Sequence, residues 1–237
     1  MQIAARQSFL TGRAVPTARD YVQDGLVAMW DGIENAGWGQ HDNATRMIDL
    51  LGTFASFPCA SMGTDCANVR ITDKLRLAIS AVRSVEFSGS IVGYSAAVLD
   101  NGIFTTTVSG SSQYGGVYTY GGIRIGNPTL RNNKVWIGVT SANSVLENAF
   151  IAADAGERFT VSLVSGDSSS VMYHNGAVKN NPTIRFYNQT WCEVNGLTGT
   201  TNRGGAGEYC CIRLYSHALT AAEVAANFAV DAARFRL

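Results

Sequence analysis

The chain has 237 residues, and its 18 lysines and arginines balance 18 aspartates and glutamates. A formal charge of zero does not favour nucleic acid or an anionic membrane surface as a partner, and no apolar run is long enough to insert into a membrane. Charged residues form only 15% of the chain, so Ser, Thr, Asn and Gly must cover much of the surface. Such a surface suits neutral ligands rich in hydroxyl groups or protein neighbours, although many β-sandwiches also have one.

The N-terminal stretch has no sustained hydrophobic period, which predicts an arm at residues 1–23 in front of one domain at 24–237. The arm either packs on its own domain or docks on a neighbouring subunit, which would give a homo-oligomer or a larger particle. The N-terminus has no hydrophobic signal core. We therefore expect either a removed leader or a protein that leaves a cytoplasm by assembly or lysis. In both cases the expected location is extracellular, on a cell surface or in a virion.

Short apolar segments, many of them alternating, predict a series of strands separated by turns rich in glycine and asparagine. The predicted strands cover residues 26–30, 47–51, 74–82, 85–87, 90–94, 103–108, 123–126, 134–139, 159–163, 171–173, 183–187 and 209–215.

The clearest of these segments form a hairpin in the second half of the chain. Phe159, Val161 and Leu163 alternate with polar residues, which predicts one buried face and one wet face. Asn175-Gly176 is a strong signal for a tight turn after the second strand. An isolated hairpin is only marginally stable in water, so a larger antiparallel structure must surround it.

Five cysteines leave at least one thiol unpaired. Cys59 and Cys66 could close a small loop. Cys192 could pair with Cys210 or with Cys211. In the alternative interpretation all five are reduced and buried as small apolar side chains. No Cys-x-x-Cys pair or histidine cluster indicates zinc.

Two polar loops carry aromatic residues that could stack on sugar rings. The first spans residues 111–122, and the second follows residue 187. In the alternative interpretation of the first loop, its tyrosines belong to a hairpin and cover the sheet. The predicted ligand-binding residues are Tyr114, Tyr118, Tyr120, Trp191, Glu193, Asn195 and Arg203.

The C-terminus predicts a short helix. Thr220 and Glu223 form a capping box, in which the two side chains bind the first free amides of the helix. An apolar stripe should seat this helix on the sandwich. Its members are Val224, Ala225, Phe228, Ala229 and Val230.

Three segments of the chain resemble the laminin G-like family of the concanavalin A-like lectin/glucanase superfamily. They are the hydrophobic-Tyr-x-Asn-Gly hairpin at 171–176, the opening strand at 24–31, and the closing strand at 212–220 with Glu223 and Asn227. The resemblance covers about residues 24 to 230. It implies an all-β fold, a jelly-roll β-sandwich of two antiparallel sheets, with the arm and the short C-terminal helix added.

The glucanase branch of this superfamily implies paired catalytic carboxylates on one strand, as Glu-x-Asp-x-Glu or a near variant. Sugar hydrolysis with retention needs two such groups about 5 Å apart. None of the seven glutamates of this chain is followed two residues later by aspartate, and no Gly-x-Ser-x-Gly nucleophile elbow is present. We therefore expect no enzymatic activity.

Calcium is the cofactor that the resemblance suggests. Laminin G-like domains often hold Ca²⁺ at the rim through carboxylate and carbonyl oxygens, the ligands that this ion prefers. The candidate ligands are Asp31, Asp42, Asp65 and Asp73. None of them lies in a dense run of acidic residues.

The sequence thus predicts a non-catalytic recognition or adhesion module that binds a glycan or surface polysaccharide at a rim formed by the two aromatic loops. The alternative is a structural or decoration subunit of a multimeric particle, such as a phage head or tail fibre or a surface appendage. The two interpretations are compatible, because a lectin-like head on an assembled particle acts as an adhesin.

Overall fold

The computed structural model of the chain describes residues 15–34, 45–79, 81–94, 101–109, 117–126, 134–141, 144–166, 170–180, 191–196 and 204–237.

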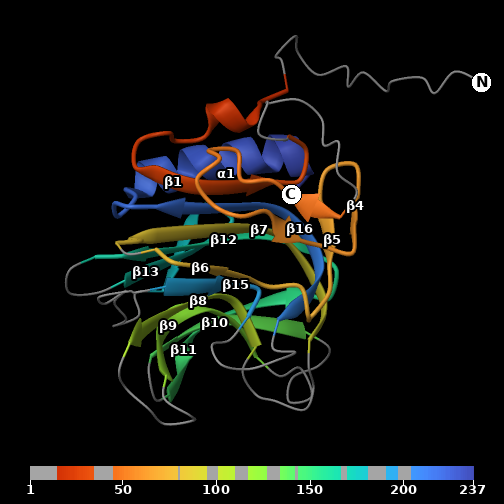
Figure 1. The fold of residues 1–237 in the computed structure, drawn as a ribbon. Helices are drawn as coiled ribbons and strands as arrows, with labels where there is room; N and C mark the ends of the chain where they lie inside the picture. Colours follow the sequence, from red (N-terminus) through yellow and green to blue (C-terminus); the bar gives the residue numbers. More distant parts are fainter. Residues whose placement is uncertain are drawn as a thin grey trace, which may run out of the picture.

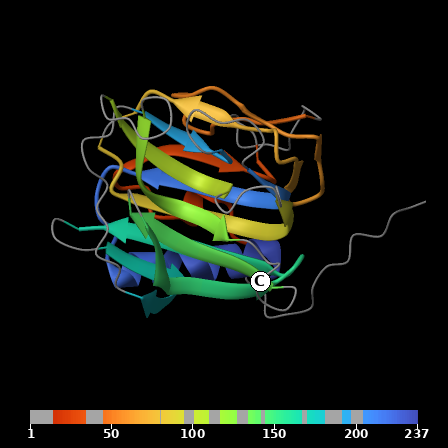
Figure 2. The same ribbon diagram turned by 90° about the horizontal axis from the view of Figure 1, so that it is seen from below.

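Two antiparallel sheets stack face to face and form a β-sandwich, which confirms the predicted fold class (Figures 1 and 2). The larger sheet has eight strands in the order β14-β13-β12-β7-β16-β5-β4, with β1 also paired to β16. These strands are β1 (Leu26–Asp31), β4 (Ser61–Met62), β5 (Ala67–Val69), β7 (Ser84–Tyr94), β12 (Arg158–Ser165), β13 (Ser170–His174), β14 (Ala177–Asn180) and β16 (Gly205–Tyr215).

The second sheet has six strands in the order β11-β10-β9-β8-β15-β6, and a small ribbon pairs β2 with β3. These strands are β2 (Arg46–Met47), β3 (Phe57–Pro58), β6 (Leu75–Leu77), β8 (Asn101–Ser109), β9 (Val117–Gly126), β10 (Lys134–Ser141), β11 (Ser144–Asp154) and β15 (Trp191–Val194).

The main hydrophobic core fills the space between the two sheets. Tyr209 lies at its centre, with its ring stacked on Phe57 and edge-on to Phe87. Trp30 is fully buried, and its indole N–H donates a hydrogen bond of 3.1 Å to the carbonyl oxygen of Ala55. A buried indole usually needs such a partner, because an unpaired polar group costs free energy in the core.

The alternating pattern predicted the strands well, but not all of their limits. The predicted strands 85–87 and 90–94 are one strand, β7. The strand predicted over 74–82 is shorter, since β6 ends at Leu77, although the alternation of exposed and buried residues continues to Ile79; Ala81, which has a positive φ of 68°, is exposed. The expected strand at 47–51 shortens to β2, whereas β3, β4, β5, β11, β14 and β15 were not predicted. The predicted strand at 183–187 lies outside the described residues.

The predicted turn at Asn175-Gly176 joins β13 to β14, with φ values of 49° and 75°. Two consecutive positive φ values are typical of the tight hairpin turn that Asn-Gly favours. The expected wet face of β12 is wrong, however: Thr160 and Ser162 are buried like their apolar neighbours. A helix covers this outer face of the sheet.

That helix is α1 (Ala221–Phe235), which lies on the outer face of the eight-stranded sheet (Figure 1). The capping box is confirmed, since Thr220 and Glu223 each bind the other's backbone amide. The predicted stripe is only partly right: Val224 and Val230 are buried, but Ala225 and Ala229 are exposed. The buried face instead contains Asn227, Asp231 and Arg234. No helix among the described residues is long and apolar enough to cross a membrane.

Within residues 15–23 of the predicted arm, Tyr21 and Val22 bind this same helix. The segment includes a single 3-10 turn, η1 (Ala18–Asp20), which begins with a capping box at Thr17. Tyr21 is buried and donates a hydrogen bond of 2.6 Å to Asp231, and the amide of Val22 donates to Asn227. This part of the arm therefore belongs to its own domain, while residues 1–14 lie outside the described residues.

The cysteine pairings expected from the sequence are wrong. Cys66 and Cys210 form a disulfide across a separation of 144 residues. Cys59, Cys192 and Cys211 are free and buried. The disulfide forms because β5 pairs with β16, which brings two cysteines together that are distant in the sequence.

Candidate ligand groove at the open end of the eight-stranded sheet

Side chains on the outer face of the eight-stranded sheet fall into rows that cross the strands, because opposite residues of neighbouring strands point to the same face. Two rows lie under α1. The first contains Ser162, Glu86 and Arg213, and the second contains Thr160, Ser88 and Cys211. The third row lies beyond the end of the helix. The same sheet therefore has a covered part and an open part.

Arg213 is the centre of the covered part and is completely buried. Its Nε lies 2.9 Å from Glu86 Oε2, and its Nη1 and Nη2 each lie 2.7 Å from a carboxylate oxygen of Asp231 on α1. Burial alone would lower the pKa of Arg213, but Asp231 and Glu86 together raise it well above its ordinary value. The arginine therefore remains charged inside the protein.

Neutral side chains complete the hydrogen bonds of these buried charges. Asn227 donates to Glu86 over 2.7 Å, and Ser88 and Tyr21 each donate to Asp231 over 2.6 Å. A buried charged network is tolerated only when its remaining donors and acceptors are satisfied. The covered part is closed to solvent and fastens the helix to the sheet, so it offers no ligand site.

The open part begins with a third row, which is polar along its whole length. It crosses five adjacent strands from β12 to β4. Its members, in order, are Arg158, Ser90, Glu208, Asn68 and Ser61.

Arg158 marks the boundary between the covered and the open part. Its Nε lies 2.8 Å from Glu208 Oε2, and its Nη1 and Nη2 lie 2.8 and 3.1 Å from the carboxylate of Asp65. Nη1 also donates to the carbonyl oxygen of Phe235, the last residue of α1, where a positive charge complements the helix dipole. Hydrogen bonding to Asp65, and then to Glu208, raises the pKa of Arg158.

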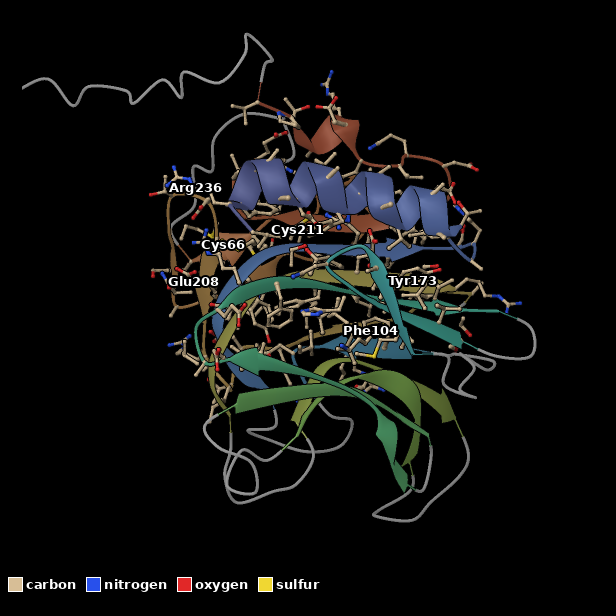
Figure 3. All side chains as sticks on the ribbon, turned by 180° about the vertical axis from the view of Figure 1, so that it is seen from behind. Cys66, Phe104, Tyr173, Glu208, Cys211 and Arg236 are labelled. Carbon is tan, nitrogen blue, oxygen red and sulfur yellow. A yellow bond between two sulfur atoms is a disulfide. The ribbon has the colours of Figure 1, made fainter. Side chains whose placement is uncertain are left out.

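The groove lies beside this row and has a volume of about 530 Å³. Figure 3 shows Glu208 on the same side of the molecule as Cys66 and Arg236, the residue that follows α1. An apolar strip formed by Val92 and Ala206 accompanies the polar row, and Val92 is 62% exposed. The residues that line the groove are Ala60, Asn68, Val69, Arg70, Ser90, Val92, Gly156, Ala206, Gly207 and Glu208.

A glycine permits the close approach of two strands at the floor of the groove. Any Cβ at Gly207 would clash with the backbone carbonyl oxygen of Ser90 on β7. The register between β7 and β16 also shifts between Ala206 and Gly207. Such an irregularity bends a strand locally, as often occurs beside binding sites.

Two polar groups of the groove retain hydrogen-bonding capacity. Glu208 uses Oε2 for Arg158, which leaves Oε1 without a partner among the described residues, and its side chain is 41% exposed. Arg70 binds Asp73 through Nε and Nη2, which leaves Nη1 without a partner, and its side chain is 62% exposed. The groove can therefore offer one fixed acceptor and one fixed donor to a ligand.

The structure places three of the four aromatic residues of the predicted site on strands of the other sheet. Tyr118 and Tyr120 belong to β9 and Trp191 belongs to β15, so the expected loops are strands at these positions. For the first loop, the pairing of β8 with β9 confirms the hairpin of the alternative interpretation, whereas the side chains of its tyrosines lie outside the described part of the structure. Tyr114 and Arg203 lie outside the described residues.

Asn195, predicted to bind ligand, instead links buried segments of the domain. Its Oδ1 accepts hydrogen bonds from the Tyr209 hydroxyl and the Gly205 amide, over 2.6 and 2.7 Å. Its Nδ2 donates to the carbonyl oxygens of Arg70 and Asp73. These bonds use the donors and acceptors of a side chain that is fully buried. The expectation of an exposed ligand contact is wrong for this residue.

Glu193, also predicted to bind ligand, lies on β15 and is only 3% exposed. Its Oε2 has no hydrogen-bond partner, and burial raises the pKa of its carboxyl group. It therefore does not lie on an exposed rim loop.

The expected calcium ligands that the structure describes are bound to arginines. Asp31 pairs with Arg234, Asp65 with Arg158, and Asp73 with Arg70. Asp42 lies outside the described residues. Within the described segments there is no group of three or more His, Cys, Asp or Glu side chains that could hold a metal ion.

The sequence could not identify the groove, because its polar row combines residues 61, 68, 90, 158 and 208. Successive members of this row lie up to 68 positions apart in the sequence, from Ser90 to Arg158. No local motif connects them, and only the register of the strands brings them together.

No protein family and no curated protein matches this sequence. Among solved structures, a sialidase of Trypanosoma rangeli in complex with sialic acid is similar with a TM-score of 0.59 and 12% identity, over 92% of this chain and 34% of the sialidase. Domain 4 of AbnA, an extracellular GH43 arabinanase from Geobacillus stearothermophilus, in complex with arabinotriose, gives a TM-score of 0.50 and 13% identity. That match covers 84% of this chain and 96% of the arabinanase domain. This chain therefore spans about a third of the sialidase, and similarity at this identity shows the fold alone.

Proposed function

We propose that this chain is a non-catalytic recognition module that binds carbohydrate in the groove beside Glu208. The observation that carries the proposal is the combination of a polar row with an exposed apolar strip in one open hollow. A sugar ring presents hydroxyl groups at its edge and C–H groups on its faces. Glu208, Asn68 and Arg70 can bind the hydroxyl groups, while Val92 and Ala206 can contact the apolar face.

The size of the groove supports a short oligosaccharide as the ligand. Its volume of about 530 Å³ falls within the roughly 300 to 1,000 Å³ of small-molecule sites. The neutral composition of the chain, with few charged residues, also suits an uncharged ligand rich in hydroxyl groups.

The similar structures support carbohydrate as the ligand class. One was solved with sialic acid and the other with arabinotriose. One fold serves many functions, so these complexes suggest a ligand class for this chain, whereas the groove supplies the candidate site. We also propose that the chain belongs to the laminin G-like, concanavalin A-like superfamily, on the basis of the motifs at 24–31, 171–176 and 212–220.

The arrangement of acidic groups supports a role without catalysis. Most glycoside hydrolases use two carboxyl groups that flank the scissile bond. Among the described residues that line the groove, Glu208 is the one carboxylate, and neighbouring Asp65 is bound to Arg158. Reducing-sugar release from a polysaccharide that the protein binds would overturn this part of the proposal.

The disulfide supports an extracellular, cell-surface or virion location, because such bonds persist mainly in oxidising surroundings. The alternative role, as a subunit of an assembled particle, rested on the N-terminal arm. Because residues 15–23 pack on their own domain, a test of that role should remove only residues 1–14. An unchanged oligomeric state by light scattering would then argue against assembly through the arm.

A glycan array tests the proposed function with two matched variants. Val92 lies in the groove and is 62% exposed, whereas Val178 lies on β14, away from the groove, and is 58% exposed. We expect saturable binding by the wild type and by Val178→Glu, and loss of binding in Val92→Glu. A folded wild type that binds no glycan, or equal binding by both variants, would contradict the proposal. Loss of binding in a chelator would assign a metal such as calcium to the site.

A further inference from the structure

We infer that Glu208 is the specificity-determining acceptor of the groove, and that Arg158 is the positioning residue that fixes it, so that the groove selects uncharged sugars over carboxylated ones. This inference rests on the proposed carbohydrate-binding function.

Glu208 is held at one oxygen and open at the other. Oε2 lies 2.8 Å from Arg158 Nε, while Oε1 contacts no donor in the described part of the chain and the side chain is 41% exposed in the groove. Ser90 separates the two residues in the row, and its small side chain lets Arg158 reach across β7 to β16. The pair therefore joins two strands that are not neighbours.

Arg158 is itself fixed from the other side. Asp65 binds both Nη1 and Nη2, and the carbonyl oxygen of Phe235 accepts from Nη1. A guanidinium held by three separate groups cannot follow a moving carboxylate. The direction of Glu208 Oε1 is therefore set before a ligand arrives, which lowers the entropic cost of binding.

An ionised carboxylate oxygen only accepts hydrogen bonds, and it has two lone pairs. Oε1 can therefore bind one or two sugar hydroxyl groups, and such charge-assisted bonds are stronger than bonds between neutral groups. Arg70 Nη1, also on the groove lining, can donate to a further hydroxyl or ring oxygen. This set of groups matches a ligand that has several hydroxyl groups and no charge.

The same groups disfavour an acidic sugar. A carboxylate ligand is best bound by a free pair of N–H groups on one arginine. Arg158 uses all three of its nitrogens for Glu208, Asp65 and Phe235. Arg70 has Nε and Nη2 on Asp73 and keeps only Nη1. A carboxylated sugar would thus be repelled by the negative charge of Glu208, and neither arginine offers it a free pair of N–H groups. This repulsion gives selectivity against acidic sugars.

The test uses neutral oligosaccharides paired with their C6-carboxylated counterparts, such as galactotriose with trigalacturonate and cellotriose with its oxidised form. Affinities are measured by calorimetry for the full chain and for Glu208→Gln, which keeps the shape but removes the charge. We expect the wild type to bind a neutral member at least tenfold more tightly than its acidic partner. We expect Glu208→Gln to bind the neutral sugar about tenfold more weakly than the wild type does, and to lose most of the preference for neutral over acidic sugars.

A double-mutant cycle tests the role of Arg158. If this residue acts through Glu208, then Arg158→Gln weakens neutral binding in the wild-type background but has little further effect in Glu208→Gln. A purely structural role would lower the affinities for both sugar classes equally and in both backgrounds. Thermal unfolding of each variant confirms that it remains folded.

The outcomes separate this inference from the proposed function. A folded wild type that binds no oligosaccharide overturns both. If Val92→Glu abolishes binding but Glu208→Gln leaves it unchanged, only the inference is overturned. A wild-type preference for carboxylated sugars, or additive effects in the cycle, also overturns the inference while the proposed function stands.

Discussion

Arg213 and Arg158 lie on the same face of the same sheet, and each is held by two carboxylates, yet their surroundings differ. Arg213 is fully buried beneath α1, whereas 22% of the Arg158 side chain is exposed where the helix ends. The helix covers the first two rows of the outer face and leaves the third open.

The arginine–carboxylate ion pair therefore has a different role in the covered part and in the open part. In the covered part, removing one partner would leave a buried charge uncompensated, which is costly, so the network fixes how α1 docks on the sheet. In the open part, solvent screens the ion pair and its contribution to stability is small. There the pair holds a carboxylate in a defined position on the surface. We therefore expect substitutions in the covered part to change folding, and substitutions in the open part to change binding.

The largest effect is expected from Asp231→Ala. It leaves Arg213 without its bidentate partner and also removes the acceptor for Ser88 and Tyr21. We expect the free energy of unfolding, measured in urea, to fall by about 3 to 5 kcal/mol. A loss no larger than that of the matched variant Asp65→Ala would mean that the covered and open parts are energetically alike.

The next largest effect is expected from removing the disulfide. The double variant Cys66→Ala/Cys210→Ala should lower the free energy of unfolding by about 2 to 4 kcal/mol, because the unfolded chain regains a long loop. The disulfide lies beside both carboxylates that hold Arg158, since Cys66 follows Asp65 and Cys210 is two residues after Glu208. If only global stability falls and sugar binding persists, the groove does not depend on this link.

Thiol titration checks that the disulfide is present. The unfolded chain should show three reactive thiols without reductant and five after reduction. In the native protein at pH 8 the three free thiols should react slowly, because they are buried and burial raises the pKa of the Cys59 thiol to about 11. Five reactive thiols in the unreduced, unfolded chain would show that no disulfide forms.

The smallest effect is expected from Asp65→Asn. The pair with Arg158 is partly exposed, so its loss should cost no more than about 1 kcal/mol. The cost should shrink further in 1 M salt, where the Debye length is only about 3 Å. Asp231→Asn should remain strongly destabilising at both salt concentrations. If the stability of the two variants depended equally on salt, Arg213 in the covered part and Arg158 in the open part would not differ as we expect.

Sequence reasoning was reliable where the signal is local. The Asn175-Gly176 turn and the capping box of Thr220 and Glu223 depend on residues within one turn of each other, and both are confirmed. The alternation of Phe159, Val161 and Leu163 correctly placed one face of β12 in the core. It failed for the opposite face, because polar residues are usually solvated and only α1 makes them buried.

What the sequence by itself determined was therefore many of the longer strands, the Asn175-Gly176 turn, the capped C-terminal helix and the sandwich fold class. These follow from backbone conformation and from apolar alternation, which act over a few residues. Tertiary structure alone decided that Cys66 meets Cys210, that Asp231 meets Arg213, and that Arg158 reaches Glu208. Each of these contacts depends on which strands pair and in which register, or on where the helix docks. Strand pairing, register and helix docking are determined by the packing of the whole domain, so no single stretch of the sequence predicts them.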